Sequence, residues 1–447
     1  MRGFSRRRSM TRELALLCVV LAVAFALRLG WMIAVDPQPS EYRVGDPYFY
    51  DLFGRSLAAG KGYLNMWGTP TAQWPPGYPI VLAAIYKVFG HSILLPKLLN
   101  VALGTATCLL AYLIGKRVFS GAVGIVAALA LAVFPSQVFW PTLLLSETLA
   151  TFLVALIAYL AIVSLVSLSW WKAVIVGVLI GATSLVRGET VLLALPLALV
   201  WAVGYRSLRT GLRYGAITLL ATGLIILPWV VRNWVVMDYP ILISTGSAEN
   251  LIGGHWSGAD GFGSFVPILE VTKLYEGLPP SEAETLSYKE ETRRAIDFAT
   301  HNPGTELRLI PKKLKAFYGT DDRPVLWTQK GTLNDPAFSD QTAARLEKLA
   351  NAYYRVVLVM AGVGMLWWFS LRNPRKLLLV LLLLYYSFFF GFVFVGEPRL
   401  HSALIPVLTI LAAASLVGIS SGIYRFGRQS RARARRAGTA GRGGVVS

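Results

Sequence analysis

Residues 377–395 read LLLVLLLLYYSFFFGFVFV, without a charged residue. An α-helix rises about 1.5 Å per residue, so a run of about 20 apolar residues crosses the hydrocarbon core of a bilayer. Nine further apolar segments resemble this one, and together they predict spans at 14–35, 93–115, 120–138, 144–167, 172–186, 190–204, 212–231, 348–370, 376–395 and 400–422. Transmembrane barrels need shorter segments of alternating hydrophobicity, and these runs do not alternate. We therefore expect an all-α polytopic membrane protein with about ten transmembrane helices.

The composition of the 447-residue chain agrees with this class. Hydrophobic residues make up 55% of the chain and charged residues 15%, whereas soluble domains carry about 25% charged residues. The net charge of +19 is not accompanied by a zinc-ligand set or an RNA-binding signature, so we expect no nucleic-acid partner. The two cysteines, Cys18 and Cys108, both fall inside apolar runs and provide no disulfide framework.

The basic residues predict the orientation in the membrane. With the amino terminus in the cytoplasm, every short basic connection falls on the cytoplasmic side, as the positive-inside rule requires. These connections contain Lys116 and Arg117, then Lys172, then Arg206, Arg209 and Arg213, then Arg372, Arg375 and Lys376, and finally the tail from Arg425 to Arg442. The first apolar stretch is too long for a signal peptide and no cleavage site follows it, so we expect a retained anchor and two cytoplasmic termini.

This topology divides the chain into four parts. Residues 1–234 form a transmembrane core that includes a first outer loop at 36–96. Residues 235–346 form an extracytoplasmic loop or small domain, residues 347–424 the last transmembrane helices, and residues 425–447 a disordered basic cytoplasmic tail. Counting residues 75–90 as a span would place Lys116 and Arg117 outside, so we expect a helix there that lies along the outer surface.

Acidic residues on the outer face are the first candidates for chemistry. Asp46 is followed by Pro47, which is the pattern of a helix N-cap, but a carboxylate there can also deprotonate an acceptor hydroxyl. Glu147 lies in the outer turns of a span, where it either interacts with the helix N-terminus or faces a cavity. Carboxylate oxygens suit a divalent cation, so Asp46 or Glu147 could hold one, whereas four histidines without a cluster argue against zinc.

Basic residues on the same face are candidates for binding a phosphate. Arg232 and Arg399 end or begin separate helices, and two such arginines either clamp a phosphate or extend to lipid headgroups. Arg187 and Glu189 form a short outer turn, which a solvated hairpin would also explain. Arg28 interrupts the first span near its outer end and either extends to the interface or faces the site. His401, taken alone, has the character of a polar interfacial residue.

Several ordered motifs resemble the GT-C superfamily of membrane glycosyltransferases, in particular the bacterial branch of family 39. That branch includes protein O-mannosyltransferase-like and lipid A aminoarabinose transferase-like enzymes. The motifs are Asp46 with Tyr50, 56–63 (SLAAGKGY), 74–79 (WPPGYP), Phe134 and Pro135 with Ser146 and Glu147, 187–189 (RGE), 228–234 (PWVVRNW), 244–246 (STG) with 250–254 (NLIGG), 302–304 (NPG) with Lys313 and Leu314, and 397–399 (EPR). The resemblance covers nearly the whole chain and rests on the order of the motifs.

The resemblance implies a GT-C fold whose site opens outward and a polyprenyl-phosphate sugar donor that arrives from the bilayer. It implies that Asp46 is the catalytic base for inverting attack, that Glu147 is a second acidic position, and that Arg232 and Arg399 hold the donor phosphate. The other candidate substrate-binding residues are Tyr50, Lys61, Tyr63, Arg187, Glu189, Asn233, Glu397 and His401. It also implies a bacterial plasma membrane location and an extracytoplasmic acceptor, which is a lipid, a glycan or a protein.

One pair of residues departs from the family pattern. Some relatives have an acidic and a basic residue directly before the double proline, where this chain has Gln73 and Trp74. This departure argues against transfer of aminoarabinose itself. A transporter or lipid flippase is the main alternative, but it predicts inverted repeats and polar residues near the midplane of the bilayer. A non-catalytic assembly or receptor protein is a second alternative, which leaves the acids and arginines of the outer face unexplained.

Overall fold

The computed structural model describes residues 2–42, 45–332, 338–368 and 370–420, so the predicted tail at 425–447 lies outside the described residues. The elements are α1 (Arg2–Ala34), η1 (Pro39–Tyr42), α2 (Asp46–Ala58), α3 (Gly77–Phe89), α4 (Leu94–Val118), α5 (Gly121–Ala132), α6 (Pro135–Phe139), η2 (Trp140–Thr142), α7 (Glu147–Ser164), α8 (Trp170–Val186), η3 (Gly188–Thr190), α9 (Ala194–Tyr205), α10 (Leu208–Met237), α11 (Gly246–Gly254), α12 (Val266–Leu274), α13 (Pro280–His301), α14 (Pro303–Phe317), α15 (Arg323–Lys330), α16 (Asp340–Trp368), α17 (Pro374–Phe388), η4 (Phe389–Val393) and η5 (Pro398–Leu404), which continues as a helix over 405–420. Over the described ranges there is no strand, and a single antiparallel bridge joins Leu64 to Pro70.

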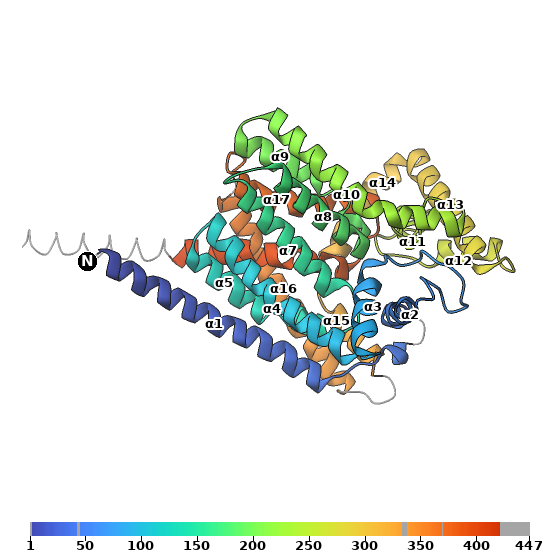
Figure 1. The fold of residues 1–447 in the computed structure, drawn as a ribbon, viewed down its shortest axis with the longest axis horizontal. Helices are drawn as coiled ribbons and strands as arrows, with labels where there is room; N and C mark the ends of the chain where they lie inside the picture. Colours follow the sequence, from blue (N-terminus) through green and yellow to red (C-terminus); the bar gives the residue numbers. More distant parts are fainter. Residues whose placement is uncertain (1, 43–44, 333–337, 369, 421–447) are drawn as a thin grey trace, which may run out of the picture.

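The predicted all-α membrane fold is confirmed. Eight helices are long and apolar enough to cross a membrane: Thr11–Ala34, Leu94–Val118, Glu147–Ser164, Gly188–Tyr205, Leu208–Met237, Asp340–Trp368, Pro374–Val393 and Pro398–Ser420. A bent pair, Gly121–Ala132 with Pro135–Thr142, and the shorter apolar helix Trp170–Val186 account for the remaining two predicted spans. Figure 1 shows these helices as a bundle, with α2, α3 and α11 to α13 gathered at the end away from the amino terminus.

The bend in the third span has a local cause and a distant partner. Pro135 cannot continue a helix from the preceding turn, and Phe134 adopts the extended backbone that precedes a proline, so α5 and α6 meet at 64°. The break ends the regular helical pairing of the last carbonyls of α5, and Leu131 O accepts from Phe134 N at 3.3 Å. Arg28 of α1 adds side-chain donors at this end: its Nη1 donates to Ala132 O at 3.2 Å and its Nη2 to Leu131 O at 3.2 Å.

The predictions for Arg28 were therefore wrong. Its side chain neither extends to the interface nor faces the site, because it is 1% exposed between α1, α4 and α5. Gly104 of α4 makes room for it, since a Cβ at Gly104 would lie 2.8 Å from Arg28 Nε. The guanidinium thus neutralises the negative end of α5 inside the bundle.

Small residues bring α8 and α10 together. A Cβ at Gly177 would lie 2.4 Å from the carbonyl oxygen of Thr218, and Thr222 Oγ1 donates to Gly177 O at 3.1 Å. Such close approach of backbones is how helices associate in a bilayer, where lipid tails are as apolar as leucine.

The end of the bundle away from the amino terminus in Figure 1 includes α3 and the helices α11 to α13. α3 has 13 residues, about 20 Å of helix, which is too short to cross a bilayer core of about 30 Å. It packs on α2 through Gly54, where a Cβ would lie 2.8 Å from Leu82 Cβ. The predicted outer segment 235–346 contains α11 to α15, and the flanking spans extend further than expected, α10 to Met237 and α16 from Asp340.

Candidate active site

Asp46 is the first residue of α2, and it does not cap the helix as predicted. Gly45 is the N-cap, its extended backbone places its carbonyl to accept from Tyr48 N at 3.0 Å, and no side chain caps this end. The carboxylate of Asp46 is therefore directed to partners outside its own helix. A negative charge in the first turn is still favoured by the helix dipole.

Both carboxylate oxygens of Asp46 are held by side chains from other parts of the chain. Oδ2 lies 2.5 Å from Arg399 Nη1, and Oδ1 accepts from Trp74 Nε1 at 3.3 Å. The Trp74 ring is itself fixed against Phe49 of α2, with ring centroids 4.3 Å apart. Asp46 is thus oriented by a charged hydrogen bond on one side and a neutral one on the other.

Glu147, the first residue of α7, lies next to this pair. Its Oε1 is 3.2 Å from Arg187 Nη1 and 3.8 Å from Arg399 Nε, while the side chain is only 2% exposed. Its buried Oε2 accepts no hydrogen bond from the described part of the chain. Leaving a buried charged oxygen without a donor is costly, so this oxygen is suited to a hydroxyl or amide that arrives with a substrate.

The turn between α8 and η3 completes the cluster. Arg187 Nε lies 3.1 Å from Glu189 Oε1, and both side chains are nearly buried, so the turn is not a solvated hairpin. The pKa of Arg187 lies above its ordinary value: burial opposes the charge, but the carboxylates of Glu189 and Glu147 outweigh it. Tyr385 of α17 holds the turn by donating to Glu189 O at 2.5 Å.

The result is a cluster of five charged residues from four distant parts of the sequence: Asp46, Glu147, Arg187, Glu189 and Arg399. We call these five residues the outer charged cluster, after the face of the membrane on which they are predicted to lie. Three carboxylates and two guanidinium groups give a formal charge of −1 when all are ionised. The arrangement brings a carboxylate and an arginine into contact at the surface end of the bundle, which suits proton abstraction beside a bound phosphate.

Arg232 does not join the outer charged cluster, so the predicted clamp of Arg232 with Arg399 is not what the structure shows. Its Nη1 donates to Thr71 O at 2.7 Å and its Nη2 to Tyr63 O at 2.9 Å. The guanidinium also lies over the Trp229 ring, 4.9 Å from its centroid. Asn233 beside it donates to Ile241 O at 2.9 Å. These two residues fix the first outer loop and the segment after α10 to the end of that helix.

The other predicted site residues lie at different distances from the cluster. Tyr50 lies beside Glu147, since its hydroxyl donates to Ser146 Oγ at 3.3 Å. Tyr63 is buried and donates to the Trp74 carbonyl at 3.0 Å, so it supports Trp74 from behind. Lys61 is exposed in the turn after α2, and Glu397 pairs with Arg323 at 2.9 Å rather than with the cluster.

His401 is not the interfacial residue that its isolated position in the sequence suggested. It is fully buried, its Nδ1 lies 2.6 Å from Phe317 O, and its Nε2 lies 3.2 Å from Asp321 Oδ1. The sequence also gave no signal for Trp327 of α15, whose ring centroid lies 5.7 Å from the guanidinium of Arg399. Only the fold brings α15 to the site.

The described side chains give little support for the divalent-cation site predicted at Asp46 or Glu147. Across the described ranges, no group of three or more His, Cys, Asp and Glu residues has the geometry to hold a metal ion. Between Asp46 and Glu147, the two predicted cation ligands, the structure places the guanidinium of Arg399.

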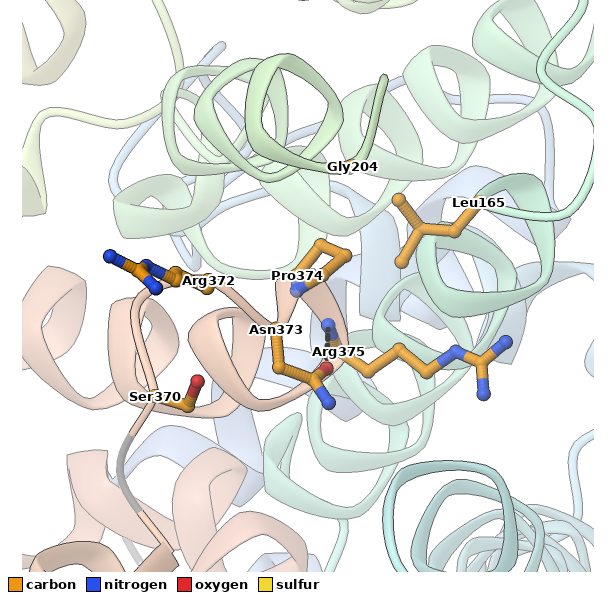
Figure 2. A pocket seen from close by; sticks show the side chains of 7 residues that line it. All are labelled: Leu165, Gly204, Ser370, Arg372, Asn373, Pro374 and Arg375. Carbon is orange, nitrogen blue, oxygen red and sulfur yellow. Dashed lines mark hydrogen bonds between the residues drawn. The ribbon is translucent and has the colours of Figure 1, made fainter. Parts of the chain in front are cut away.

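A separate cavity of about 420 Å³ lies at the other end of the bundle (Figure 2). Its lining residues are Leu165, Gly204, Ser370, Arg372, Asn373, Pro374 and Arg375. Leu165 follows the last residue of α7, whereas Glu147 begins this helix of 18 residues, so about 27 Å of helix separates the cavity from the cluster. Figure 2 shows the side chains of Arg372 and Arg375 pointing away from each other, and Asn373 caps α17. The cavity is therefore not part of the candidate active site.

Comparisons with known proteins support the fold. Residues 73–233 match the sequence profile of the family described as dolichyl-phosphate-mannose-protein mannosyltransferase. This stretch includes Glu147, Arg187 and Glu189. No curated protein sequence matches the chain.

Solved structures match over most of the chain. The archaeal oligosaccharyltransferase AglB from Archaeoglobus fulgidus, in complex with an inhibitory peptide and a dolichol-phosphate, superposes with a TM-score of 0.55 at 14% identity over 95% of this chain. The chain covers 52% of AglB, so it spans about half the length of that enzyme. The same oligosaccharyltransferase tethered with an acceptor peptide gives a TM-score of 0.53 at 14% identity, over 93% of this chain and 50% of that one.

ArnT from Cupriavidus metallidurans, bound to undecaprenyl phosphate, gives a TM-score of 0.42 at 13% identity, over 91% of this chain and 78% of ArnT. The family match and the AglB superposition confirm the resemblance found in the sequence motifs. The chain is a multi-pass membrane protein with the fold of the GT-C membrane glycosyltransferases.

Proposed function

We propose that this protein transfers a sugar from a polyprenyl-phosphate-linked donor to an extracytoplasmic acceptor with inversion, and that Asp46 is the general base. The observation that carries the proposal is the contact of Asp46 with Arg399 beside Glu147 and Arg187. A base and a phosphate-binding cation must line the same site in such an enzyme, on opposite sides of the anomeric carbon, because the acceptor attacks that carbon opposite the phosphate that leaves.

The charged residues have separate roles in the proposed reaction. Asp46 takes the proton of the acceptor hydroxyl, whose oxygen forms a bond to the anomeric carbon of the sugar. The bond between that carbon and the phosphate oxygen breaks, and its electron pair leaves with the polyprenyl phosphate. Arg399, with Arg187 behind it, neutralises the charge that develops on the phosphate. Attack opposite the leaving phosphate inverts the configuration of the carbon.

The contact between Asp46 and Arg399 also gives an order to these events. Arg399 occupies Asp46 Oδ2, the oxygen that would accept the proton, whereas Trp74 holds only Oδ1. A donor phosphate competes for the guanidinium and draws it away from Asp46. Donor binding then frees the base, so an acceptor is deprotonated only when a sugar is present to receive it.

The direction in the membrane follows from the proposed topology. We propose that the site lies at the outer leaflet of a bacterial plasma membrane, with both termini in the cytoplasm. The short basic connections of the sequence, and the position of the outer charged cluster at the other end of α7 from Leu165, support this orientation. A polyprenyl phosphate reaches such a site from the bilayer, and an acceptor reaches it from outside. The acceptor is a lipid, a glycan or a protein.

Release of polyprenyl phosphate from a panel of polyprenyl-phosphate sugars tests the proposal. We expect the purified wild type to release carrier from one of these donors and Asp46→Asn to lose at least 99% of that activity. Asp238→Asn is the matched control, because Asp238 is an exposed aspartate after α10 and the same substitution there leaves the site unchanged. Equal turnover by wild type and Asp46→Asn would remove Asp46 as the base. If no donor is consumed with any acceptor present, the transporter alternative is favoured.

A further inference from the structure

The segment that carries Arg399 is short and mostly without regular α-helix. Residues 394–397 follow η4 without helical structure, and Arg399 is the second residue of η5. Its contact with Asp46 therefore depends on how this segment is held, because no long helix fixes the backbone at this point.

A buried histidine holds the segment two residues after Arg399. His401 Nδ1 lies 2.6 Å from Phe317 O, at the end of α14, and its Nε2 lies 3.2 Å from Asp321 Oδ1. The imidazole ring stacks on Tyr354 of α16, with ring centroids 4.7 Å apart and an interplanar angle of 5°. Three elements from outside the segment thus determine where His401 lies.

The hydrogen-bond partners of His401 show which of its ring nitrogens carries a hydrogen. A backbone carbonyl only accepts, so His401 Nδ1 carries a hydrogen and donates it to Phe317 O. One proton is then shared between His401 Nε2 and Asp321 Oδ1, whether the pair is imidazolium and carboxylate or imidazole and carboxylic acid. Asp321 is fixed in turn, since its backbone N donates to Asn351 Oδ1 of α16 at 2.7 Å.

The same segment is held on its other side, before Arg399. His255 Nε2 lies 3.0 Å from Val393 O, and Gly396 N donates to Gly261 O at 2.9 Å. Gly396 packs so closely on α14 that a Cβ there would lie 2.0 Å from Lys313 O. Contacts with α14 and with the chain around α11 therefore hold the backbone both before and after Arg399.

We propose that His401, held by Phe317 and Asp321, is a positioning residue that sets η5 in the register in which Arg399 meets Asp46 and Glu147. The inference rests on the proposed function, because Arg399 is taken to bind the donor phosphate. It assigns His401 a role other than contact with substrate, since the side chain is fully buried behind η5. It also gives α14, from the outer segment, a direct effect on the site.

A double-mutant cycle with Arg399 tests this role. We expect His401→Leu to raise the KM for the donor at least ten-fold, with a smaller effect on kcat, because Arg399 is displaced rather than removed. In an Arg399→Ala background, we expect His401→Leu to add less than a two-fold change, because both substitutions remove the same interaction. A purely structural role would give the same loss in both backgrounds, and that result would overturn the inference.

If His401→Leu does not fold, two more conservative substitutions at His401 still test the proposal. His401→Asn retains a donor near Phe317 O, and His401→Gln retains a group near Asp321, so each is expected to restore part of the donor affinity. His301→Leu is the control, because His301 is exposed at the end of α13 and its hydrogen bonds within the described residues are to Thr300 and Asp297 of its own helix. If all His401 variants fold and keep the wild-type KM, the inference is wrong.

Equilibrium binding of polyprenyl phosphate separates this inference from the proposed function. If the wild type transfers sugar but His401→Leu binds polyprenyl phosphate as tightly as the wild type, only the positioning role fails. If the wild type binds polyprenyl phosphate and transfers no sugar, the proposed function fails, and the same cycle run on binding still decides the role of His401. If the wild type binds no polyprenyl phosphate, both are overturned.

Discussion

Arg399 Nη1 lies 2.5 Å from the carboxylate of Asp46, a residue 353 positions earlier in the chain. The contact joins the start of the first outer helix to the start of the last span. Its two partners were each identifiable in the sequence, but nothing in the sequence placed them in contact.

Replacing Arg399 by lysine should lower kcat/KM for the donor by about 10²-fold, and replacing it by alanine by about 10³-fold. Lysine retains the charge but loses the planar fork that meets Asp46 and Glu147 together. Removal of one preorganised donor typically costs a factor of about 10² to 10³. Steady-state kinetics of polyprenyl-phosphate release measures kcat/KM for both variants. Wild-type kinetics in Arg399→Ala would contradict the proposal that Arg399 binds the donor phosphate.

Glu147→Gln should reduce kcat by roughly 10²-fold while the protein remains folded. The amide keeps the shape of the side chain but removes the charge that Arg187 and Arg399 share. We expect a larger effect on kcat than on the thermal midpoint, which circular dichroism of the purified protein measures. Glu276→Gln, an exposed substitution after α12, serves as the control. An unaltered kcat would make Glu147 a structural residue.

Arg232→Ala should loosen the first outer loop before it affects donor binding. The substitution leaves the carbonyls of Tyr63 and Thr71 without their donor, so hydrogen exchange across residues 60–74 should accelerate. The effect on activity should be smaller than that of Arg399→Ala. If Arg232→Ala raises the donor KM as much as Arg399→Ala does and hydrogen exchange is unchanged, Arg232 binds the phosphate after all.

Arg28→Met should destabilise the bundle by about 1–3 kcal/mol, because the buried Ala132 O at the break of α5 loses its side-chain donor and Leu131 O keeps only Phe134 N. Gly104→Ala should have an effect in the same direction, since its Cβ would displace the Arg28 side chain. Thermal unfolding in detergent measures both. Cys18→Ser, at an exposed position on the same helix, is the control and should leave the midpoint unchanged.

The raised pKa of Glu291 leads us to expect that the free energy of unfolding depends on pH. Burial, together with the charge of Glu249, raises the pKa of Glu291 in α13 from 4.5 to about 8. The folded protein therefore holds a proton that the unfolded chain releases above pH 4.5, and stability falls as the pH rises from 4.5 to 8. The slope reaches about 1.4 kcal/mol per pH unit for this one proton.

Thermal midpoints measured between pH 5 and pH 9 check this sign. Glu291→Gln removes the titrating group, so its midpoint should depend less on pH and should exceed that of the wild type near pH 8. Identical pH dependence in the two proteins would show that Glu291 is not protonated in the folded state.

Much of the fold could be predicted from the sequence, because membrane spans depend on local composition. The all-helical class and the approximate number of spans follow from the apolar runs, and the outer position of Asp46, Glu147, Arg187 and Arg399 stays a prediction from the basic residues between them. The bend at Pro135 was not predicted, since the sequence there remains apolar on both sides.

Side-chain partners could not be predicted, because they come from distant parts of the chain. Arg28 and Arg232 have the same charge as Arg399, but carbonyls over 100 residues away bind their guanidinium groups. Asp46 was predicted as an N-cap because it precedes a proline, whereas Gly45 takes that position with its backbone alone. In each case the sequence identified a residue of interest, but it did not identify the group that this residue contacts.

The bond from Arg28 to the end of α5 has a consequence for how the protein is made. Residue 28 enters the bilayer about 100 residues before the carbonyls that bind it have been synthesised. During that interval a guanidinium on the first helix must be shielded by water, lipid headgroups or the insertion machinery, because a lone charge at membrane depth is costly. A generic leucine-rich anchor would insert more readily in place of α1, but the completed bundle would then lack the donors that close its broken helix.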